Sequence, residues 1–318
     1  MIGAGNFASL VLLPAMSKTP AVLKTIASSG GTSAALAARK FRFQEAASDY
    51  RTVLDDPAIN TVFIATRHNT HAQLVIDALR AGKHVFVEKP LALNRDELSD
   101  IEQALAQAGD RQLLVGFNRR FSSLAVRLRT LLASRIEPCS LVYTVNAGAI
   151  PLDHWTQDLQ VGGGRIVGEV CHFIDLLCYL AGHPIVGLEA RMVGYTPSLP
   201  TRSDRMSILI EFADGSTGVV HYLANGSKSY PKERVEVFSQ GRVLVLDNFK
   251  QLKGYGWPGF RTMRLSRQDK GHQAEVSAFV ERIEHGGEWL IPWQTLREVT
   301  LATFVAMERA AETPRELK

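Results

Sequence analysis

Two hydrophobic patterns follow one another along the chain. Up to about residue 121, short apolar runs alternate with stretches in which apolar residues recur every three or four positions. Strand, helix and strand in alternation, with short connections, predict a doubly wound α/β domain with a parallel sheet. The predicted strands cover 22–27, 62–65, 83–87 and 113–117, and the predicted helices cover 7–16, 34–41, 70–81 and 95–108, with a short helix near 50–55.

Beyond residue 121, strands follow one another with little helix between them. Asp214-Gly215 and Gln240-Gly241 are typical of tight hairpin turns, so these strands predict a mainly antiparallel, open sheet in an α+β domain. The predicted division is therefore 1–120 and 121–318, and a helix over 293–311 is a candidate to pack back on the N-terminal domain. The predicted strands cover 141–146, 187–193, 206–212, 217–223, 234–239 and 242–247.

The amino-acid composition argues against several classes of protein. Of 318 residues, 36 are Lys or Arg and 32 are Asp or Glu, and without a basic run this balance argues against nucleic acid as a partner. Three cysteines, Cys139, Cys171 and Cys178, are too few and too scattered for a disulfide framework or a metal cluster. No apolar stretch is long enough to span a membrane, so we expect a cytoplasmic protein with no membrane or metal partner.

The first predicted strand is almost missing. The chain opens Met1-Ile2-Gly3, so few residues precede the glycine turn that begins at Gly3. We expect either that the polypeptide begins upstream, as one module of a larger enzyme, or that the strand is clipped.

The stretch Gly3-Ala4-Gly5-Asn6-Phe7-Ala8 matches the Gly-x-Gly-x-x-Gly/Ala pattern between a strand and a helix. The first glycine permits a tight turn, the second lets a pyrophosphate approach the backbone, and Ala8 keeps helix and sheet close. Gly3, Gly5, Asn6 and Phe7 are therefore candidates for binding a dinucleotide. The helix N-terminus would offer N–H groups to its phosphates.

The second predicted strand ends in Ser28-Ser29-Gly30-Gly31, where an acid would bind the ribose 2′-hydroxyl of NAD. Without that carboxylate, a 2′-phosphate is no longer repelled. We therefore predict that NADP is tolerated or preferred over NAD, with Ser28 and Ser29 as ligands and Arg39 or Lys40 as counter-charges.

Polar residues follow the third and fifth strands at the edge where ligands bind in parallel sheets. Asn69 and Thr70 suit helix caps. The remaining residues are candidates to line the cofactor cleft, although solvated histidines are as common as ligands. These candidates are Thr66, Arg67, His68, His71 and, after the fifth strand, Asn118.

Glu88-Lys89-Pro90 ends the fourth strand on the same edge. Pro90 removes a backbone donor and keeps Lys89 out of the helical region, so the ammonium stands on a stiff backbone. A plain salt bridge of Glu88 is the alternative. The position favours Glu88 and Lys89 as cofactor ligands, and Lys89 also as a catalytic group.

A glycine run, Gly162-Gly163-Gly164, precedes a helix that carries Glu169, His172 and Asp175. Residues three apart are neighbours along one side of a helix. A capped histidine in a charged stripe is one interpretation. The other is an imidazole that two carboxylates orient and make more basic for proton transfer.

Together the glycine turn, Glu88-Lys89-Pro90 and the His172 helix resemble the glucose-fructose oxidoreductase, inositol dehydrogenase and rhizopine-catabolism protein family, Gfo/Idh/MocA, over essentially the whole chain. The resemblance implies a Rossmann domain binding NAD(P), an open antiparallel sheet, and hydride transfer at a hydroxyl-bearing carbon of a sugar, nucleotide sugar or cyclitol. It also implies a homodimer or homotetramer joined through the exposed face of the sheet.

By this resemblance Lys89 would contact the nicotinamide ribose and the substrate hydroxyl, and His172 would exchange the hydroxyl proton. Many members carry Asp four residues before the histidine, where this chain has Gly168, so we expect Glu169 to replace it. A non-catalytic dinucleotide-binding sensor is the alternative. The substrate-binding candidates are Arg119, Asn146, His154, Trp155 and Asp175, with Arg120 and Asp153 beside them.

Overall fold

The computed structural model describes residues 1–193 and 204–312. The chain forms two compact units. Unit 1 contains Met1–Asn118 and Gly271–Arg297, and unit 2 contains Arg119–Lys270 and the residues from Glu298 onward. The domain boundary at residue 120 stays a prediction.

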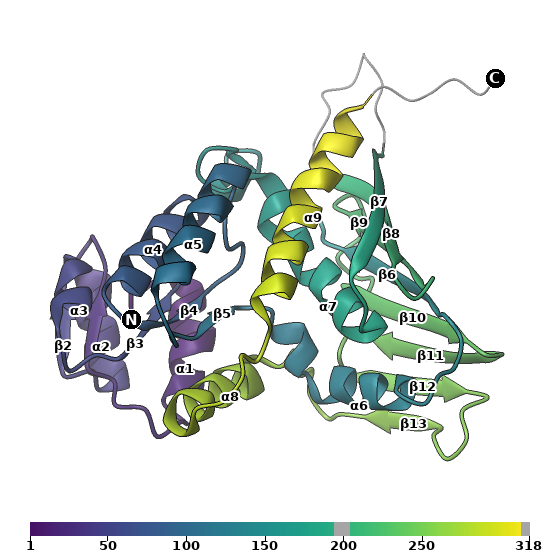
Figure 1. The fold of residues 1–318 in the computed structure, drawn as a ribbon, viewed down its shortest axis with the longest axis horizontal. Helices are drawn as coiled ribbons and strands as arrows, with labels where there is room; N and C mark the ends of the chain where they lie inside the picture. The colour runs from purple at the N-terminus through teal and green to yellow at the C-terminus, as the bar shows by residue number, and fades with distance from the viewer. Residues whose placement is uncertain (194–203, 313–318) are drawn as a thin grey trace. The chain divides into compact units, whose positions relative to one another are not determined.

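Unit 1 is built on parallel strands, as predicted for the first half of the chain (Figure 1). Ile2 forms parallel bridges with Ala27 and Ile64, so it stands where the first strand of the sheet belongs. The resulting order, β2-β1-Ile2-β3-β4-β5, is that of a Rossmann fold. The strands are β1 (Thr25–Ala27), β2 (Glu45–Ala47), β3 (Thr61–Ile64), β4 (His84–Val87) and β5 (Leu113–Val115).

The helices of unit 1 pack in pairs on this sheet. Helix α4 lies beside α5, and the helix after the glycine turn, which is a π-helical segment η1 followed by α1, packs against α8. The predicted helices are confirmed to within a few residues at their ends. The bounds are η1 (Ala8–Leu12), α1 (Leu13–Met16), α2 (Thr32–Phe41), α3 (Arg51–Asp55), η2 (His68–Thr70), α4 (His71–Arg80), α5 (Arg95–Gln107) and α8 (His272–His285).

Helix α8 was not predicted from the sequence. Phe279 is almost fully buried, and its ring packs 5.7 Å from that of Phe63 and 5.9 Å from that of Phe86. These contacts hold α8 on the parallel sheet, far along the chain from the strands it covers. Strand β2 was also missed, because its residues Glu45–Ala47 are largely exposed and lack an apolar pattern.

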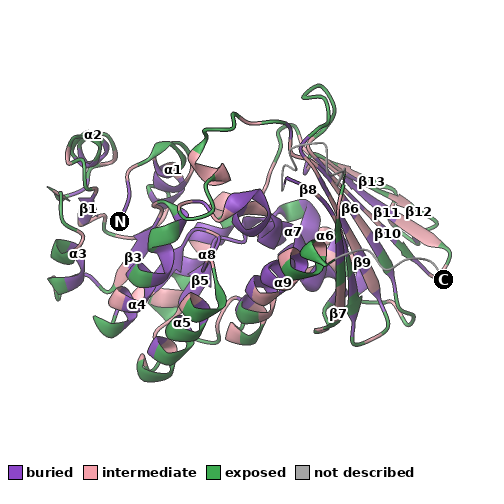
Figure 2. Ribbon diagram, turned by 90° about the horizontal axis from the view of Figure 1, so that it is seen from above, coloured by how far each residue is buried: buried purple, intermediate pink, exposed green. Residues whose placement is uncertain are grey.

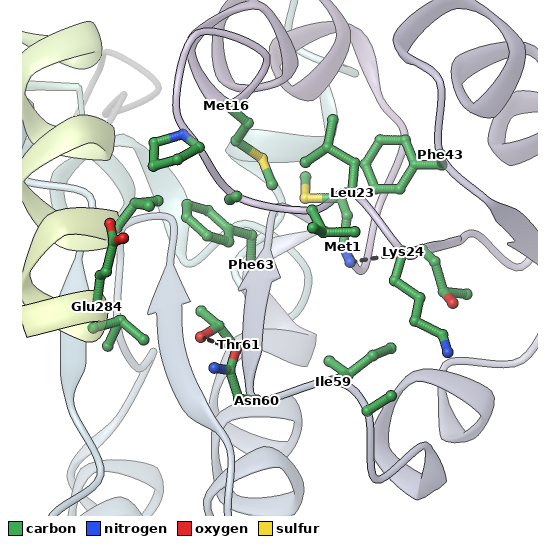
Figure 3. A pocket seen from close by; sticks show the side chains of 17 residues that line it. Met1, Met16, Leu23, Lys24, Phe43, Ile59, Asn60, Thr61, Phe63 and Glu284 are labelled. Carbon is green, nitrogen blue, oxygen red and sulfur yellow. Dashed lines mark hydrogen bonds between the residues drawn. The ribbon is translucent and has the colours of Figure 1, made fainter.

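Unit 1 contains a cavity of about 430 Å³ at the amino ends of β1 and β3 (Figure 3). Met1, Met16, Leu23 and Phe63 give it an apolar lining, and Glu284 of α8 lies at its side. Ligands of parallel sheets bind at the carboxyl ends of the strands. This cavity is therefore at the wrong end of the sheet for the cofactor.

Unit 2 is an open sheet with the strand order β13-β12-β11-β10-β6-β9-β8-β7 in the described residues. All neighbouring pairs are antiparallel except β6 and β9, which run parallel. The mainly antiparallel sheet is thus confirmed. The bounds are β6 (Ser140–Asn146), β7 (Ile185–Met192), β8 (Arg205–Phe212), β9 (Thr217–Leu223), β10 (Glu233–Ser239), β11 (Arg242–Asp247), β12 (Gln251–Tyr255) and β13 (Thr262–Arg264).

Alternation places one face of this sheet in the core. Tyr143 of β6, Tyr222 of β9 and Val235 of β10 are fully buried, whereas the residues directly before and after each of them in its strand are partly exposed. Helices α6 and α7 contact the sheet and each other, and α7 is buried almost all round (Figure 2). The bounds are η3 (Asn118–Phe121), α6 (Ser123–Leu132), η4 (Trp155–Gln157), η5 (Ile166–Val170), α7 (Cys171–Ala181) and α9 (Trp293–Ala311).

Both predicted hairpin turns are present. Gln240 and Gly241 have φ values of 54° and 69°, which fit the type I′ turn that matches strand twist. Strands β12 and β13 and helix α6 were missed. The helix over 293–311 was predicted with its observed bounds.

No helix within residues 1–193 and 204–312 is long and apolar enough to cross a membrane.

Candidate active site

The glycine turn has the geometry that a dinucleotide requires. Gly3 has φ 100°, and a Cβ built on it would lie 2.2 Å from the Ala65 carbonyl oxygen, so only glycine fits. A Cβ built on Gly5 would meet no atom within 4 Å, so this backbone is open to a pyrophosphate. The Ser9 N–H donates to the Gly5 carbonyl over 2.9 Å, which shows that the helix begins directly after the turn. Asn6 and Phe7 start that helix and are exposed.

The segment after β1 contains hydroxyls and no acid. Ser28 and Ser33 share a hydrogen bond of 2.9 Å between their hydroxyls, and Ser29 is exposed. Arg39 and Lys40 lie in the last turn of α2, whereas Ser33 lies in its first. At 1.5 Å per residue these cations are about 10 Å along the helix from Ser33, which disfavours them as counter-charges for a 2′-phosphate.

The segment after β3 brings together most of the predicted cofactor residues of that edge. Thr66 and Thr70 share a hydrogen bond of 2.7 Å between their hydroxyls, and Arg67 is exposed. His71 is fully buried, and its Nδ1 lies 2.8 Å from the Pro90 carbonyl oxygen. Burial lowers the pKa of His71 to about 4, so its imidazole is neutral at neutral pH. His68 is also buried, with its ring 5.6 Å from that of His71.

Glu88, Lys89 and Pro90 stand at the carboxyl end of β4, as predicted. The Glu88 carboxylate lies over Gly116, where a Cβ would approach its Oε1 to 2.8 Å, so the acid is packed against the end of β5. Lys89 is half-buried, and the Lys89–Pro90 peptide bond is cis. Asn118 is buried at the start of η3, after β5.

His172 lies in the first turn of α7 and is 8% exposed. The preceding segment, η5, is π-helical and contains Glu169. Glu169, His172 and Asp175 therefore do not form the regular α-helical stripe that was predicted. Both Asp175 oxygens accept from Arg120, over 3.0 Å from Nε and 2.5 Å from Nη2. That carboxylate is therefore engaged in a buried salt bridge.

Glu169 is held by two partners. The Tyr222 hydroxyl donates to its Oε2 over 3.0 Å, and Arg165 Nη2 lies 3.4 Å from its Oε1. Arg165 is 2% exposed, lies over the Tyr222 ring at 5.3 Å, and donates to the Gly148 carbonyl over 2.7 Å. Burial, and then the charge of Glu169, raise the pKa of Tyr222, so the phenol stays a donor to the carboxylate.

Arg119 takes part in a buried cluster around Glu233. Its Nε and Nη2 donate to the two Glu233 oxygens over 2.6 and 2.9 Å, and Lys270 and Tyr143 each donate to Glu233 over 2.6 Å. Burial would raise the pKa of Glu233, but the charges and hydrogen bonds of Arg119 and Lys270 keep it well below its usual range. Arg119 thus has a structural partner that the sequence did not reveal.

The remaining predicted substrate residues lie in loops of unit 2. Asn146 Nδ2 donates to the Ser227 carbonyl over 2.6 Å, so this side chain holds the loop after β9. His154 precedes η4 and is exposed, its Nδ1 2.8 Å from the Thr156 hydroxyl, and its ring stacks on Trp155 at 5.9 Å. Trp155 is half-buried.

Residues 1–117 match the model of the oxidoreductase family with an NAD-binding Rossmann fold, GFO_IDH_MocA. The N-terminal part of the chain is thus similar to this oxidoreductase family. A myo-inositol 2-dehydrogenase of Thermotoga maritima is 26% identical over 295 residues, covering 88% of this chain and 85% of that protein. A levoglucosan dehydrogenase of Pseudarthrobacter phenanthrenivorans is 30% identical over 235 residues, covering 64% of this chain and 59% of that protein.

A solved dehydrogenase structure has the same fold. A levoglucosan dehydrogenase in complex with NADH and levoglucosan superimposes with a TM-score of 0.81, at 26% identity, covering 98% of this chain and 96% of that one. The fold class predicted from the sequence is therefore also that of this solved dehydrogenase.

Four residues of the site region were missed. Arg165 could have been found, because it lies four residues before Glu169, a spacing that brings helical side chains together. Tyr222, Glu233 and Lys270 join their partners from distant parts of the chain. Only the folded sheet brings them into contact.

Proposed function

We propose that this chain is an NAD(P)-dependent dehydrogenase that transfers hydride between nicotinamide and a hydroxyl-bearing carbon of a sugar, nucleotide sugar or cyclitol. The proposal rests mainly on the residues that lie at the carboxyl edge of the unit 1 sheet. Gly3 and Gly5 there form a turn open to a pyrophosphate, and Lys89 follows β4, which is separated from the Ile2 position by β3 in the same sheet. Relatives named for dehydrogenation of inositol and levoglucosan support the substrate class.

The proposed mechanism assigns Lys89 and His172 to one reaction. The nicotinamide, when bound, supplies the acceptor or donor of the hydride. His172 removes the proton of the substrate hydroxyl, which raises electron density at oxygen and makes the carbon–hydrogen bond a better hydride donor. The Lys89 ammonium donates a hydrogen bond to that oxygen and stabilises its developing negative charge. In the reverse direction His172 returns the proton to the alkoxide while Lys89 stabilises its charge.

Glu169 takes the role of the acid that is absent at Gly168. Arg165 and Tyr222 hold its carboxylate in one orientation, over 3.4 and 3.0 Å. A fixed anion near an imidazole favours its protonated form and so raises its basicity. In this proposal Glu169 acts on His172 and does not itself exchange the hydroxyl proton.

For the cofactor we propose that NADP is accepted at least as well as NAD. The support is the acid-free segment after β1, where Ser28 offers a hydroxyl already paired with Ser33. Equilibrium binding of both cofactors checks this, and a preference for NAD of tenfold or more would refute it.

Substrate binding is assigned to residues of unit 2. Trp155 offers an aromatic face to a sugar ring, with His154 stacked on it. Asn146 supports substrate binding by holding the loop after β9, and Asp175 does so through its salt bridge with Arg120. Arg119 is assigned to substrate binding from its position beside Glu233.

We further propose a homodimer or homotetramer joined through the outward face of the unit 2 sheet. Leu209 of β8 and Phe238 of β10 are 40% and 45% exposed there, whereas their neighbours in sequence point into the core. Light scattering on the wild type and on Phe238→Glu tests this. A monomeric wild type would contradict the proposal.

A screen of neutral sugars, nucleotide sugars and cyclitols with each cofactor, followed by nicotinamide absorbance, tests the main proposal. Lys89→Ala and His172→Ala should each lower kcat by at least about a hundredfold, as expected for proton-transfer groups. Tight dinucleotide binding without turnover of any compound would instead favour a sensor.

A further inference from the structure

His71 connects the segments that follow two neighbouring strands. It is the first residue of α4 and is fully buried. Its Nδ1 lies 2.8 Å from the carbonyl oxygen of Pro90, which follows Lys89, and its Nε2 lies 3.3 Å from the carbonyl oxygen of Thr66. The sequence suggested that this imidazole faces the cofactor, but both of its nitrogens are directed at backbone carbonyls of unit 1.

The protonation state of the ring decides which contact is a hydrogen bond. A neutral imidazole carries one N–H, and the shorter distance places it on Nδ1, so Nδ1–H donates to the Pro90 carbonyl. A charged ring would donate at both nitrogens, but burial and the positive charge of Lys89 oppose it. The bond to Pro90 is therefore the shortest of the backbone contacts that a variant of His71 would remove, beside those with Thr66 and Glu88.

The far end of the segment from Lys89 to Asn94 is held by side-chain hydrogen bonds at the start of α5. The Asn94 side chain accepts from the Glu97 N–H over 2.9 Å, and Glu97 Oε2 accepts from the Leu93 N–H over 2.7 Å, as in a capping box. Leu91 and Ala92 are buried between the two anchors. His71 thus fixes the end of the segment that carries Lys89.

We propose that His71 is a positioning residue, which holds Lys89 in its reactive place through the carbonyl of Pro90. This inference rests on the proposed function, because it assigns to Lys89 the stabilisation of the substrate oxygen. Misplacement of a catalytic group by about 1 Å can cost about a hundredfold in rate. We therefore expect His71→Ala to lower kcat at least tenfold and to change the Kd for the dinucleotide less than threefold.

A double-mutant cycle with Lys89→Ala separates positioning from general damage. If His71 acts through Lys89, then adding His71→Ala to Lys89→Ala lowers kcat less than threefold further. If the two losses multiply, the inference is wrong. If Lys89→Ala keeps normal kcat, the proposed function fails instead, so the two failures are distinguishable.

Two variants complete the kinetic arm. His71→Asn places an N–H close to the position of Nδ1. The fall in log kcat from the wild type should therefore be at least one third smaller in His71→Asn than in His71→Ala. His84→Ala is the matched control, because this histidine accepts from the Gln112 N–H over 3.0 Å at the opposite end of the sheet. It should keep kcat within threefold.

Hydrogen exchange tests the same contact without any substrate. The amides of residues 88–93 should exchange at least tenfold faster in His71→Ala than in wild type, and His71→Asn should restore most of the protection. Residues 113–115 of β5 should change less than threefold. Unchanged exchange over 88–93, or equal acceleration throughout unit 1, would overturn the inference.

Discussion

The cluster around Glu233 should be a major source of stability for unit 2. The Glu233 side chain is fully buried, while the side chains of Arg119 and Lys270 are 8% and 18% exposed. Glu233→Ala would leave both cations without this counter-charge and the Tyr143 hydroxyl without its acceptor. Removing one partner of a buried ion pair typically costs about 3–5 kcal/mol. We expect a loss in this range, which is at least about a hundredfold in the folding equilibrium.

Urea unfolding followed by circular dichroism and by tryptophan fluorescence measures this change, and agreement of the two probes supports two-state treatment. The matched control is Glu236→Ala in the same strand. Its carboxylate pairs with Arg234 over 2.9 Å, but these side chains are 29% and 39% exposed, so the expected cost is below about 1 kcal/mol. Equal effects of the two substitutions would refute the reasoning.

A second comparison separates charge from packing. Glu233→Gln keeps the shape of the side chain but removes its charge, so it should lose most of what Glu233→Ala loses. Replacing Arg119 and Glu233 together by methionine removes the buried pair and should recover part of the stability. A double variant less stable than Glu233→Ala would show that shape matters more than charge.

Two further predictions follow from the site. Tyr222→Phe removes a hydrogen bond to the Glu169 carboxylate and should lower kcat about tenfold with little change in KM, which steady-state kinetics measures. His71 should make unfolding depend on pH: its pKa is about 4 in the fold and about 6.5 when unfolded, so below pH 6.5 the unfolded state binds the extra proton. Stability should therefore fall by up to about 3 kcal/mol between pH 6.5 and 4, and His71→Asn should remove this part of the fall in urea titrations.

Each of these has its own control. Tyr255→Phe changes an exposed tyrosine of β12 and should leave kcat unchanged, so a similar loss in both tyrosine variants would contradict the role of Tyr222. The stabilising contribution of Glu233 is also lost as pH falls below about 4.5. The effect of His71 is therefore measured as the difference in unfolding free energy between the wild type and His71→Asn at each pH. Parallel stability curves over pH 4–6.5 would contradict the buried, neutral state of His71.

Local patterns predicted most of the fold. Strands β9 and β11 and helix α9 were predicted with their observed bounds, because alternation or a helical stripe fixes each of them within its own sequence. Helix α8 was missed because its position depends on Phe279, whose partners Phe63 and Phe86 are about two hundred residues away in sequence. Its local pattern alone did not reveal it.

The sequence indicated candidate site residues but not the side chains that they contact. Gly3, Lys89 and His172 could be found from motifs, since strand ends and a glycine run mark them. The partners of Arg119 and Glu169 could not, because Glu233 and Tyr222 come from strands 114 and 53 residues further along. The π-helical turn η5 was also invisible, since its residues would equally suit an α-helix.

The most direct test of the central claim is the reduction of NAD or NADP by the intact chain with a panel of sugars and cyclitols, measured in the wild type and in Lys89→Ala and His172→Ala. The proposed function predicts turnover of at least one compound by the wild type and a loss of at least about a hundredfold in each variant. Near-normal turnover in both variants would contradict it.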